Sequence, residues 1–241
     1  PGEEGGEHVR RVLDLHPSCL VAWGRLDFPF ALLQERQRDV ERVVFVLSLE
    51  TELQVRADRV LTDAWHGGYI AARHLLEQGR KRLLLLAHPL STTADSFRHT
   101  LDGQLIQGFR MALDEAGPTV SGEVHFATRD EAETLRQRTA LFSRPNGPDA
   151  ALAAAAVQAV QLLRLLRDLG RRVPEDVAVA GYYDTPWCMQ TDPPLTSVSI
   201  RAPEIARLAA ERLLSTDTET AALRVKPELV VRGSSIVGAA P

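Results

Sequence analysis

Histidines, cysteines and carboxylates form no recognisable catalytic or metal-binding motif in this sequence. His66 and His74 lie about two turns apart on a predicted helix, whereas a helical zinc pair needs four-residue spacing. Asp184 and Asp192 lie in a proline-rich segment with no evident acid–base partner. The sequence also contains no glycine-rich phosphate-binding loop and no nucleophile elbow. We therefore expect a binding protein rather than an enzyme, with no metal or other cofactor.

The composition is that of a globular protein without a general affinity for nucleic acid or lipid. The chain has 241 residues, enough for one large domain or for two lobes with separate cores. Its formal net charge is −4, which gives no overall attraction to DNA. Cys19 and Cys188 cannot form a disulfide framework, and no apolar run approaches the roughly 20 residues of a membrane span. We expect a cytoplasmic protein that does not bind membranes.

Short apolar segments alternate with longer segments of helical period, a pattern typical of βαβ units around parallel sheets. The predicted strands are residues 18–24, 42–49, 59–62, 82–87, 123–127, 150–154, 177–181, 197–200 and 224–231. One predicted helix follows Asp63 and ends at Gln78, and the others cover 103–115, 130–142, 155–169 and 203–214. Basic residues at 80–82 and 171–172 follow helices, where cations favour the helix dipole, so we interpret them as capping charges.

Several motifs, in their order along the chain, resemble the LacI/GalR family of bacterial transcriptional regulators. Residues 60–89 are similar to the family's Asp-led helix and the strand after it. Residues 166–200 resemble its V-P-x-D-V-x-V-x-G-Y-D-D … P-x-L-T segment, and 227–235 its closing L-V-x-R-x-S. Shorter matches lie at 107–109 and 148–150, so the resemblance covers nearly the whole chain.

The resemblance implies a periplasmic-binding-protein-like α/β fold of two doubly wound parallel-sheet lobes, joined by three crossovers, with a small molecule held between them. By motif, residues 1–90 and 194–220 form the N-terminal lobe, and 91–193 and 223–235 form the C-terminal lobe. We find no match to the family's helix-turn-helix headpiece or to its first strand–helix–strand. We hypothesise that the sequence belongs to a longer protein, which an intact mass measurement would test.

The resemblance also identifies ligand-contacting positions, and three of them lack the family's polar residues. Leu105 stands in place of an arginine, Ala155 begins an Ala-Ala pair in place of Asn-Asp, and Tyr183 replaces the first aspartate of G-Y-D-D. Asp63 is retained, and Asp184 follows Tyr183. A charged hydrogen bond contributes about 1.5–3 kcal/mol, so losing three removes most of the roughly 8 kcal/mol of a micromolar affinity. We do not expect a simple aldose to bind in the family's usual way.

Three alternatives remain for this site. In the first, the effector is less polar and stacks on Tyr183 and Trp187. In the second, the site has lost its ligand. Otherwise, new polar contacts come from residues at the edges of the site, namely His88, Ser91, Thr92 and His125.

The leading functional prediction is the effector-binding and dimerisation core of a regulator, a repressor acting as a homodimer. Family resemblance places residues 184–193 and the helix after Ala155 at the dimer interface. Operator DNA would be bound through a headpiece that this sequence does not contain. The alternative is a solute-binding receptor of a transport system, which has the same fold, and an enzyme is a distant third.

Overall fold

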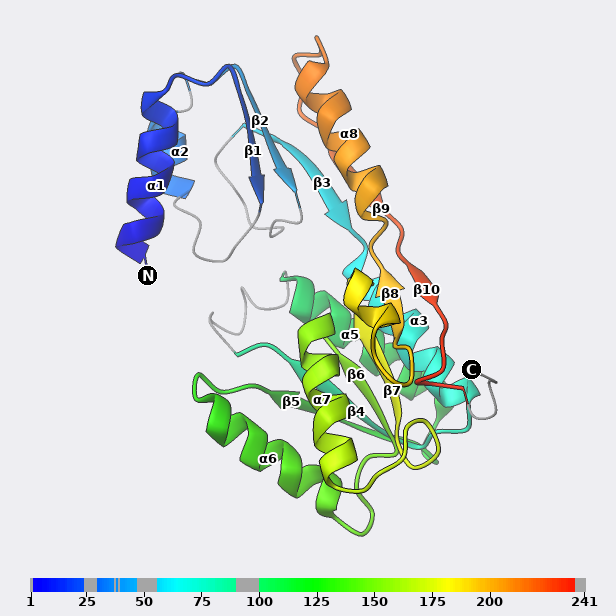
Figure 1. Ribbon diagram of the computed structural model, residues 1–241. Helices are drawn as coiled ribbons and strands as arrows, with labels where there is room; N and C mark the ends of the chain where they lie inside the picture. Colours follow the sequence, from blue (N-terminus) through cyan, green and yellow to red (C-terminus); the bar gives the residue numbers. More distant parts are fainter. Residues whose placement is uncertain are drawn as a thin grey trace. The chain divides into compact units, whose positions relative to one another are not determined.

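The computed structural model describes residues 2–23, 30–36, 38, 40–46, 56–89 and 100–236 (Figure 1). The chain divides into two compact units, and each is described by itself. Unit 1 comprises Pro1–Asp63 and Arg201–Val225, and unit 2 comprises Ala64–Ile200 and Lys226–Pro241. The chain therefore passes from one unit to the other three times. No helix within the described ranges has both the length and the hydropathy of a membrane span.

Unit 1 contains a parallel sheet with helices on both faces. The strand order is β1 (Cys19–Trp23), β2 (Arg42–Val46), β3 (Asp58–Thr62) and β9 (Ala222–Val225). Helices α1 (Gly2–Asp14) and α2 (Phe30–Glu35) cover one face, and α8 (Ala202–Leu214) packs on β2 and β3. Leu13, Leu33 and Phe45 are fully buried and join α1, α2 and β2 in one apolar cluster.

A buried carboxylate ties four segments of unit 1 together. Asp58, at the start of β3, is 2% exposed. One carboxylate oxygen accepts hydrogen bonds from Arg212 Nε and from the backbone N of Ala221, both at 2.8 Å. The other accepts from Arg42 Nη1 at 3.0 Å. The Asp58 carboxylate is buried and both of its oxygens accept hydrogen bonds. Replacing Asp58 or one of its two arginines would therefore leave a charge of the opposite sign without its partner.

Unit 2 contains a six-stranded sheet in the order β10, β8, β7, β6, β4, β5. The strands are β4 (Arg82–Ala87), β5 (Ser121–Phe126), β6 (Ala150–Ala153), β7 (Ala178–Tyr182), β8 (Thr196–Ser199) and β10 (Glu228–Val230). Only the β8–β10 pair is antiparallel among these strands. Leu84 and Leu86 are completely buried against helices, as the non-alternating run in β4 predicts.

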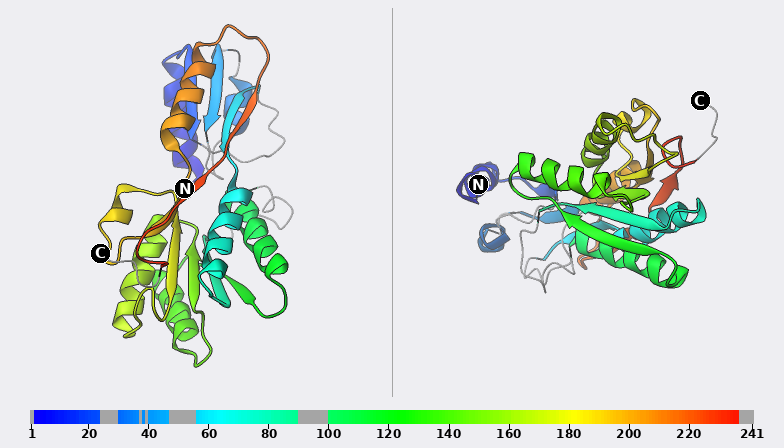
Figure 2. Two further views of the ribbon diagram at one scale, coloured as in Figure 1. Left: turned by 90° about the vertical axis from the view of Figure 1, so that its right-hand side faces the viewer. Right: turned by 90° about the horizontal axis from the view of Figure 1, so that it is seen from below.

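Two pairs of helices enclose this sheet. The left view of Figure 2 shows α6 (Glu131–Ser143) and α7 (Ala156–Asp168) on one side, and α3 (Ala64–Glu77) and α5 (Leu101–Ala116) on the other. Glycines allow α3 and α5 to cross closely. A Cβ on Gly68 would lie 2.1 Å from the Leu105 carbonyl oxygen, and one on Gly108 would lie 1.9 Å from that of Trp65. These distances are too short for any side chain, so the crossing requires glycine at both positions.

A buried polar network fastens the last described residues to α3 and β8. His74 Nε2 lies 2.7 Å from Ser235 Oγ, which lies 2.7 Å from Thr196 Oγ1. Ser234 Oγ accepts from the Thr196 backbone N at 2.8 Å and donates to the Val179 carbonyl at 2.6 Å. Burial lowers the pKa of His74, which keeps it neutral within the core.

The predicted fold class, two lobes with parallel sheets, is confirmed, and the predicted strands and helices recur with small shifts at their ends. Three details differ from the sequence-based predictions. The chain changes lobe after Asp63 and after Ile200, rather than near residues 90 and 193, because β4 and β8 both pair within the sheet of unit 2. The strand predicted at 224–231 is two strands, one in each unit, interrupted at Pro227. Helices α1 and α2 were not predicted.

Candidate functional site

The candidate site lies at the carboxyl edge of the sheet in unit 2. Strands β4 to β8 are parallel, so their carboxyl ends share this edge. The neighbouring strands β4 and β6 lead into helices on opposite faces, α5 and α7. Where connections diverge in this way, an open α/β sheet forms a crevice that binds ligands. His88 follows β4 and Ala155 follows β6, so these residues lie at this switch point of the sheet.

His88 and Asp102 form a polar pair beside this point. His88 Nδ1 lies 2.9 and 3.1 Å from the two carboxylate oxygens of Asp102, and the backbone N of His88 donates to the same carboxylate at 3.1 Å. Asp102 is in the first turn of α5, whose N-cap is Thr100. The hydrogen bond to Asp102 raises the pKa of His88 in spite of its burial. When the ring of His88 is protonated, its second N–H, on Nε2, can bond to another acceptor.

Tyr183 follows β7, and its hydroxyl lies within electrostatic range of Asp102. Its φ of 86° is unusual for a non-glycine residue, and its backbone N donates to the Val198 carbonyl at 2.8 Å. Its ring packs edge-on against Tyr182, with centroids 5.1 Å apart. Burial and the charge of Asp102 raise the pKa of Tyr183 to about 12. The hydroxyl is thus neutral near pH 7 and can both donate and accept hydrogen bonds.

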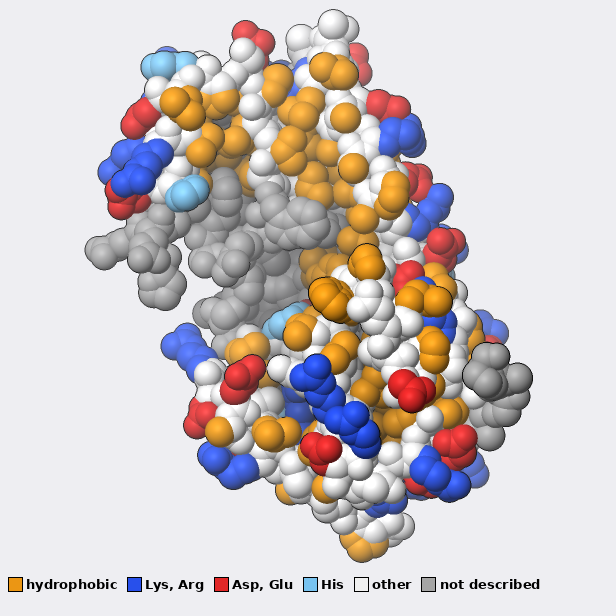
Figure 3. Space-filling view, viewed as in Figure 1, with side chains coloured by type: hydrophobic (Ala, Val, Ile, Leu, Met, Phe, Trp, Pro, Cys, Tyr) orange, Lys and Arg blue, Asp and Glu red, His pale blue; other side chains and the backbone are white. Residues whose placement is uncertain are grey.

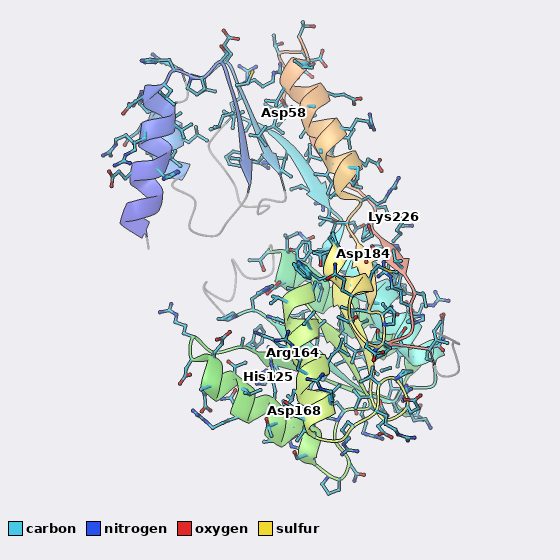
Figure 4. All side chains as sticks on the ribbon, in the orientation of Figure 1. Asp58, His125, Arg164, Asp168, Asp184 and Lys226 are labelled. Atoms are coloured by element: carbon cyan, nitrogen blue, oxygen red, sulfur yellow. The ribbon has the colours of Figure 1, made fainter. Side chains whose placement is uncertain are left out.

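His125 and Arg138 lie on the α6 side of the site. His125 Nε2 lies 3.0 Å from Gln137 Oε1, and Gln137 Nε2 donates to Glu133 at 2.8 Å, which assigns the proton of neutral His125 to Nε2. Burial lowers the pKa of His125. Arg138, the residue after Gln137, is only 4% exposed, and burial lowers its pKa. Figure 4 labels His125.

The structure places the predicted site residues in different surroundings. Tyr183 and Ala155 lie at the carboxyl edge, and Ala155 caps α7 without a side-chain hydrogen bond. Leu105 is 2% exposed, and its backbone packs against Gly68. Trp187, in the short helix η2 (Pro186–Met189), is 66% exposed.

The structure also describes the two predicted site aspartates, Asp63 and Asp184. Asp63 is the last residue of the first segment of unit 1, where its backbone N donates to the Val225 carbonyl at 3.1 Å. Asp184 is labelled in Figure 4 and forms an ion pair with Arg232, with oxygen–nitrogen distances of 2.6 and 3.2 Å. Its carboxylate therefore already has a partner.

The alternative set of polar residues is only partly described. His88 and His125 lie at the carboxyl edge, whereas Ser91 and Thr92 lie outside the described residues. Sequence reasoning did not identify Asp102 or Arg138. The signal for Arg138 was its helical spacing, because Thr134, Arg138, Leu141 and Phe142 are the buried residues of α6.

No three His, Cys, Asp or Glu side chains within the described ranges are placed to hold a metal ion. The polar groups of the carboxyl edge are instead suited to hydrogen bonding with an organic ligand.

Comparison with known proteins identifies the family. The profile of the periplasmic binding protein-like domain matches residues 72–235. The chain belongs to this domain family. Among its relatives, the HTH-type transcriptional regulator DegA of Bacillus subtilis is 31% identical over 185 residues, 74% of this chain and 52% of DegA. The regulator CelR of Thermobifida fusca is 35% identical over 176 residues, 70% of this chain and 49% of CelR.

Solved structures agree with this assignment of the periplasmic binding protein-like domain. A structure of the transcriptional regulator CelR in complex with cellobiose has 29% sequence identity and a TM-score of 0.76, and the match covers 97% of this chain and 71% of that one. The resemblance to LacI-family regulators is thereby confirmed. The chain spans about half the length of the curated relatives it matches.

Proposed function

We propose that this chain is the effector-binding core of a LacI-family transcriptional regulator that acts as a repressor. The observation that carries the proposal is the polar cluster of His88, Asp102 and Tyr183 at the switch point of the sheet in unit 2. A binding role, rather than catalysis, fits a cluster in which His88 and Asp102 are hydrogen-bonded to each other and Tyr183 lies near Asp102. Its relatives DegA and CelR are regulators, which favours this function over a solute-binding receptor.

The effector would be a small molecule that contacts the carboxyl edge. CelR has been solved with cellobiose, so a regulator with this fold can bind a saccharide. In this chain Leu105 is buried and Asp184 is held by Arg232. These positions therefore offer few free polar groups to a simple sugar. We infer that the effector bonds to His88, Asp102 and Tyr183 instead.

The regulator would act as a homodimer through α7 and the segment after β7. Val157, Trp187 and Met189 are between 62% and 66% exposed, which is unusual for large apolar side chains. Side chains of α7, the residues 170–173 that follow it, and residues 190–193 line one groove. Figure 3 shows basic side chains over α7, and Figure 4 labels Arg164 there. A two-fold dimer suits a palindromic operator in the cytoplasm, where the protein would bind DNA through a headpiece.

The decisive experiment uses the protein expressed from the complete gene, because regulation depends on the whole molecule. A thermal-shift screen with sugars, nucleosides, amino acids and aromatic acids would identify a stabilising compound. Fluorescence anisotropy on DNA from upstream of the gene would then be measured with and without that compound. We expect the compound to change the DNA affinity at least fivefold, as effectors with a coupling of about 1 kcal/mol do. A protein that binds no promoter DNA would refute the function.

A further inference from the structure

Arg138 is a buried cation with an unused hydrogen-bonding edge. It is 4% exposed, and its Nε and Nη2 have no hydrogen-bond partner within the described part of the structure. Buried arginines are ordinarily paired, because an uncompensated charge away from water is costly. Nε–H and Nη2–H form the side-on fork of a guanidinium, which matches the two oxygens of a carboxylate or phosphate.

The sheet register places two histidines on the same face as this fork. His125 of β5 pairs with Leu86 of β4, so both side chains project to one face. Leu86 packs in the cluster formed with α6 and α7, and His88, two residues later, continues on that face. Gln137 of α6 contacts His125 directly. Arg138, the next residue of α6, is therefore beside the carboxyl ends of β4 and β5.

Among the described residues, no carboxylate forms an ion pair with Arg138. His125 Nδ1 is also buried without a partner among the described residues, but as the unprotonated ring nitrogen it can only accept a hydrogen bond. The pKa of His88 is raised chiefly by its hydrogen bond to Asp102, against the nearby charge of Arg138, and the pKa of His125 is lowered by burial and, to a lesser extent, by Arg138. Asp102 lies on the opposite side of His88 and is bonded to its Nδ1. The remaining donor of His88, Nε2, is available to the same anion as the fork.

We propose that Arg138, with His88, binds an oxyanion group of the effector, either a carboxylate or a phosphate. This inference rests on the proposed function, because it assigns the chemical class of the ligand at that site. The fork binds two oxygens of the group, and protonated His88 donates to it through Nε2. The lost polar residues at Leu105 and Ala155 are consistent with recognition that has moved to the α6 side of the site.

The test compares wild-type protein with Arg138→Met, using Arg136→Met as the matched control. Arg136 is on the same helix, but it is exposed and paired with Glu133. Thermal shift and calorimetric titration would use glucose, glucuronate, glucose 6-phosphate and inorganic phosphate. Glucuronate distinguishes a carboxylate ligand from a phosphate ligand, and glucose is the neutral reference.

We expect at least one anion, and not glucose, to bind wild type and Arg136→Met equally, and Arg138→Met at least tenfold more weakly. Without ligand, Arg138→Met should be as stable as wild type or more stable, because it removes an unpaired buried charge. Arg138→Lys keeps the charge without the fork, and it too should bind the anion at least tenfold more weakly. A large loss of stability or failure to fold in Arg138→Met would mean that the arginine is structural, which would overturn the proposal.

The outcomes separate this proposal from the function on which it rests. If neutral sugars stabilise wild type and Arg138→Met alike while anions do not, the oxyanion site is wrong and the regulator function stands. If anions bind through Arg138 but leave DNA binding of the complete protein unchanged, the oxyanion site stands and the effector function is wrong. If no anion binds, the oxyanion proposal is overturned.

Discussion

Replacing Gly108 by alanine should destabilise unit 2 by about 2 kcal/mol, although alanine is the better helix former. The added Cβ would lie 1.9 Å from the Trp65 carbonyl oxygen, in a place where real contacts are essentially never shorter than 3.0 Å. Helices α3 and α5 must therefore separate by about 1 Å, which weakens their packing. Overpacking at a backbone-to-backbone contact costs about 3 kcal/mol of stability. The higher helix propensity of alanine offsets about 1 kcal/mol of this cost.

Chemical and thermal unfolding, followed by circular dichroism, would measure this loss. For a unit of this size, about 2 kcal/mol corresponds to a midpoint lower by about 4–8 °C. Arg110→Ala on the same helix is the control, because Arg110 is exposed and its replacement should change stability by less than about 0.5 kcal/mol. If Gly108→Ala is as stable as wild type, α3 and α5 do not cross as described and the reasoning is refuted.

Three further predictions concern separate parts of the chain. Asp58→Asn should destabilise unit 1 by about 3 kcal/mol in urea unfolding, because Arg42 and Arg212 lose a buried partner; a change below about 1 kcal/mol would contradict this. The pKa of His74 is lowered from 6.5, so its neutral form contributes stability that is present above pH 6.5 and lost as the pH falls. His74→Gln should therefore reduce the drop in thermal midpoint between about pH 7 and about pH 5, and an unchanged drop would argue against a buried neutral histidine. Trp187→Glu should raise the dimer dissociation constant at least tenfold in sedimentation experiments, and unaltered association would exclude this surface.

The elements of the fold could be predicted because their sequence signals are local. The run around Leu84 is apolar at every position, and Gly79 and Gly117 stop helices at positive φ. The boundary of the lobes could not be placed in this way, since an apolar run does not say which sheet it joins. Pairing of β4 with β5 and β6, which decides the boundary at Asp63, is a long-range property.

The candidate site was predictable only at the strand ends. His88 and Tyr183 follow predicted strands and His125 lies within one, and the folded sheet places all three at or near its carboxyl edge. The roles of other residues depend on distant partners. Asp184 could be assigned to a ligand because nothing local reveals its ion pair with Arg232, 48 positions away.

Arg138 was overlooked for a different physical reason. A charged residue in a helix rich in polar residues is expected to face water. Its helical spacing with Leu141 and Phe142 was the one local signal, and the packing of α6 on the sheet shows that the side chain is buried. The unpaired fork is thus a property of the folded unit and not of the local sequence.

The central claim, that the carboxyl edge of unit 2 holds the effector, can be tested most directly by nuclear magnetic resonance of the histidine side chains. A compound that stabilises the wild-type protein would be titrated while the imidazole nitrogens are observed. We predict that the resonances of His88 and His125 shift and saturate with the thermal stabilisation, while those of His74, buried against Ser235, stay unchanged. Saturating binding that leaves His88 and His125 unmoved would contradict the account.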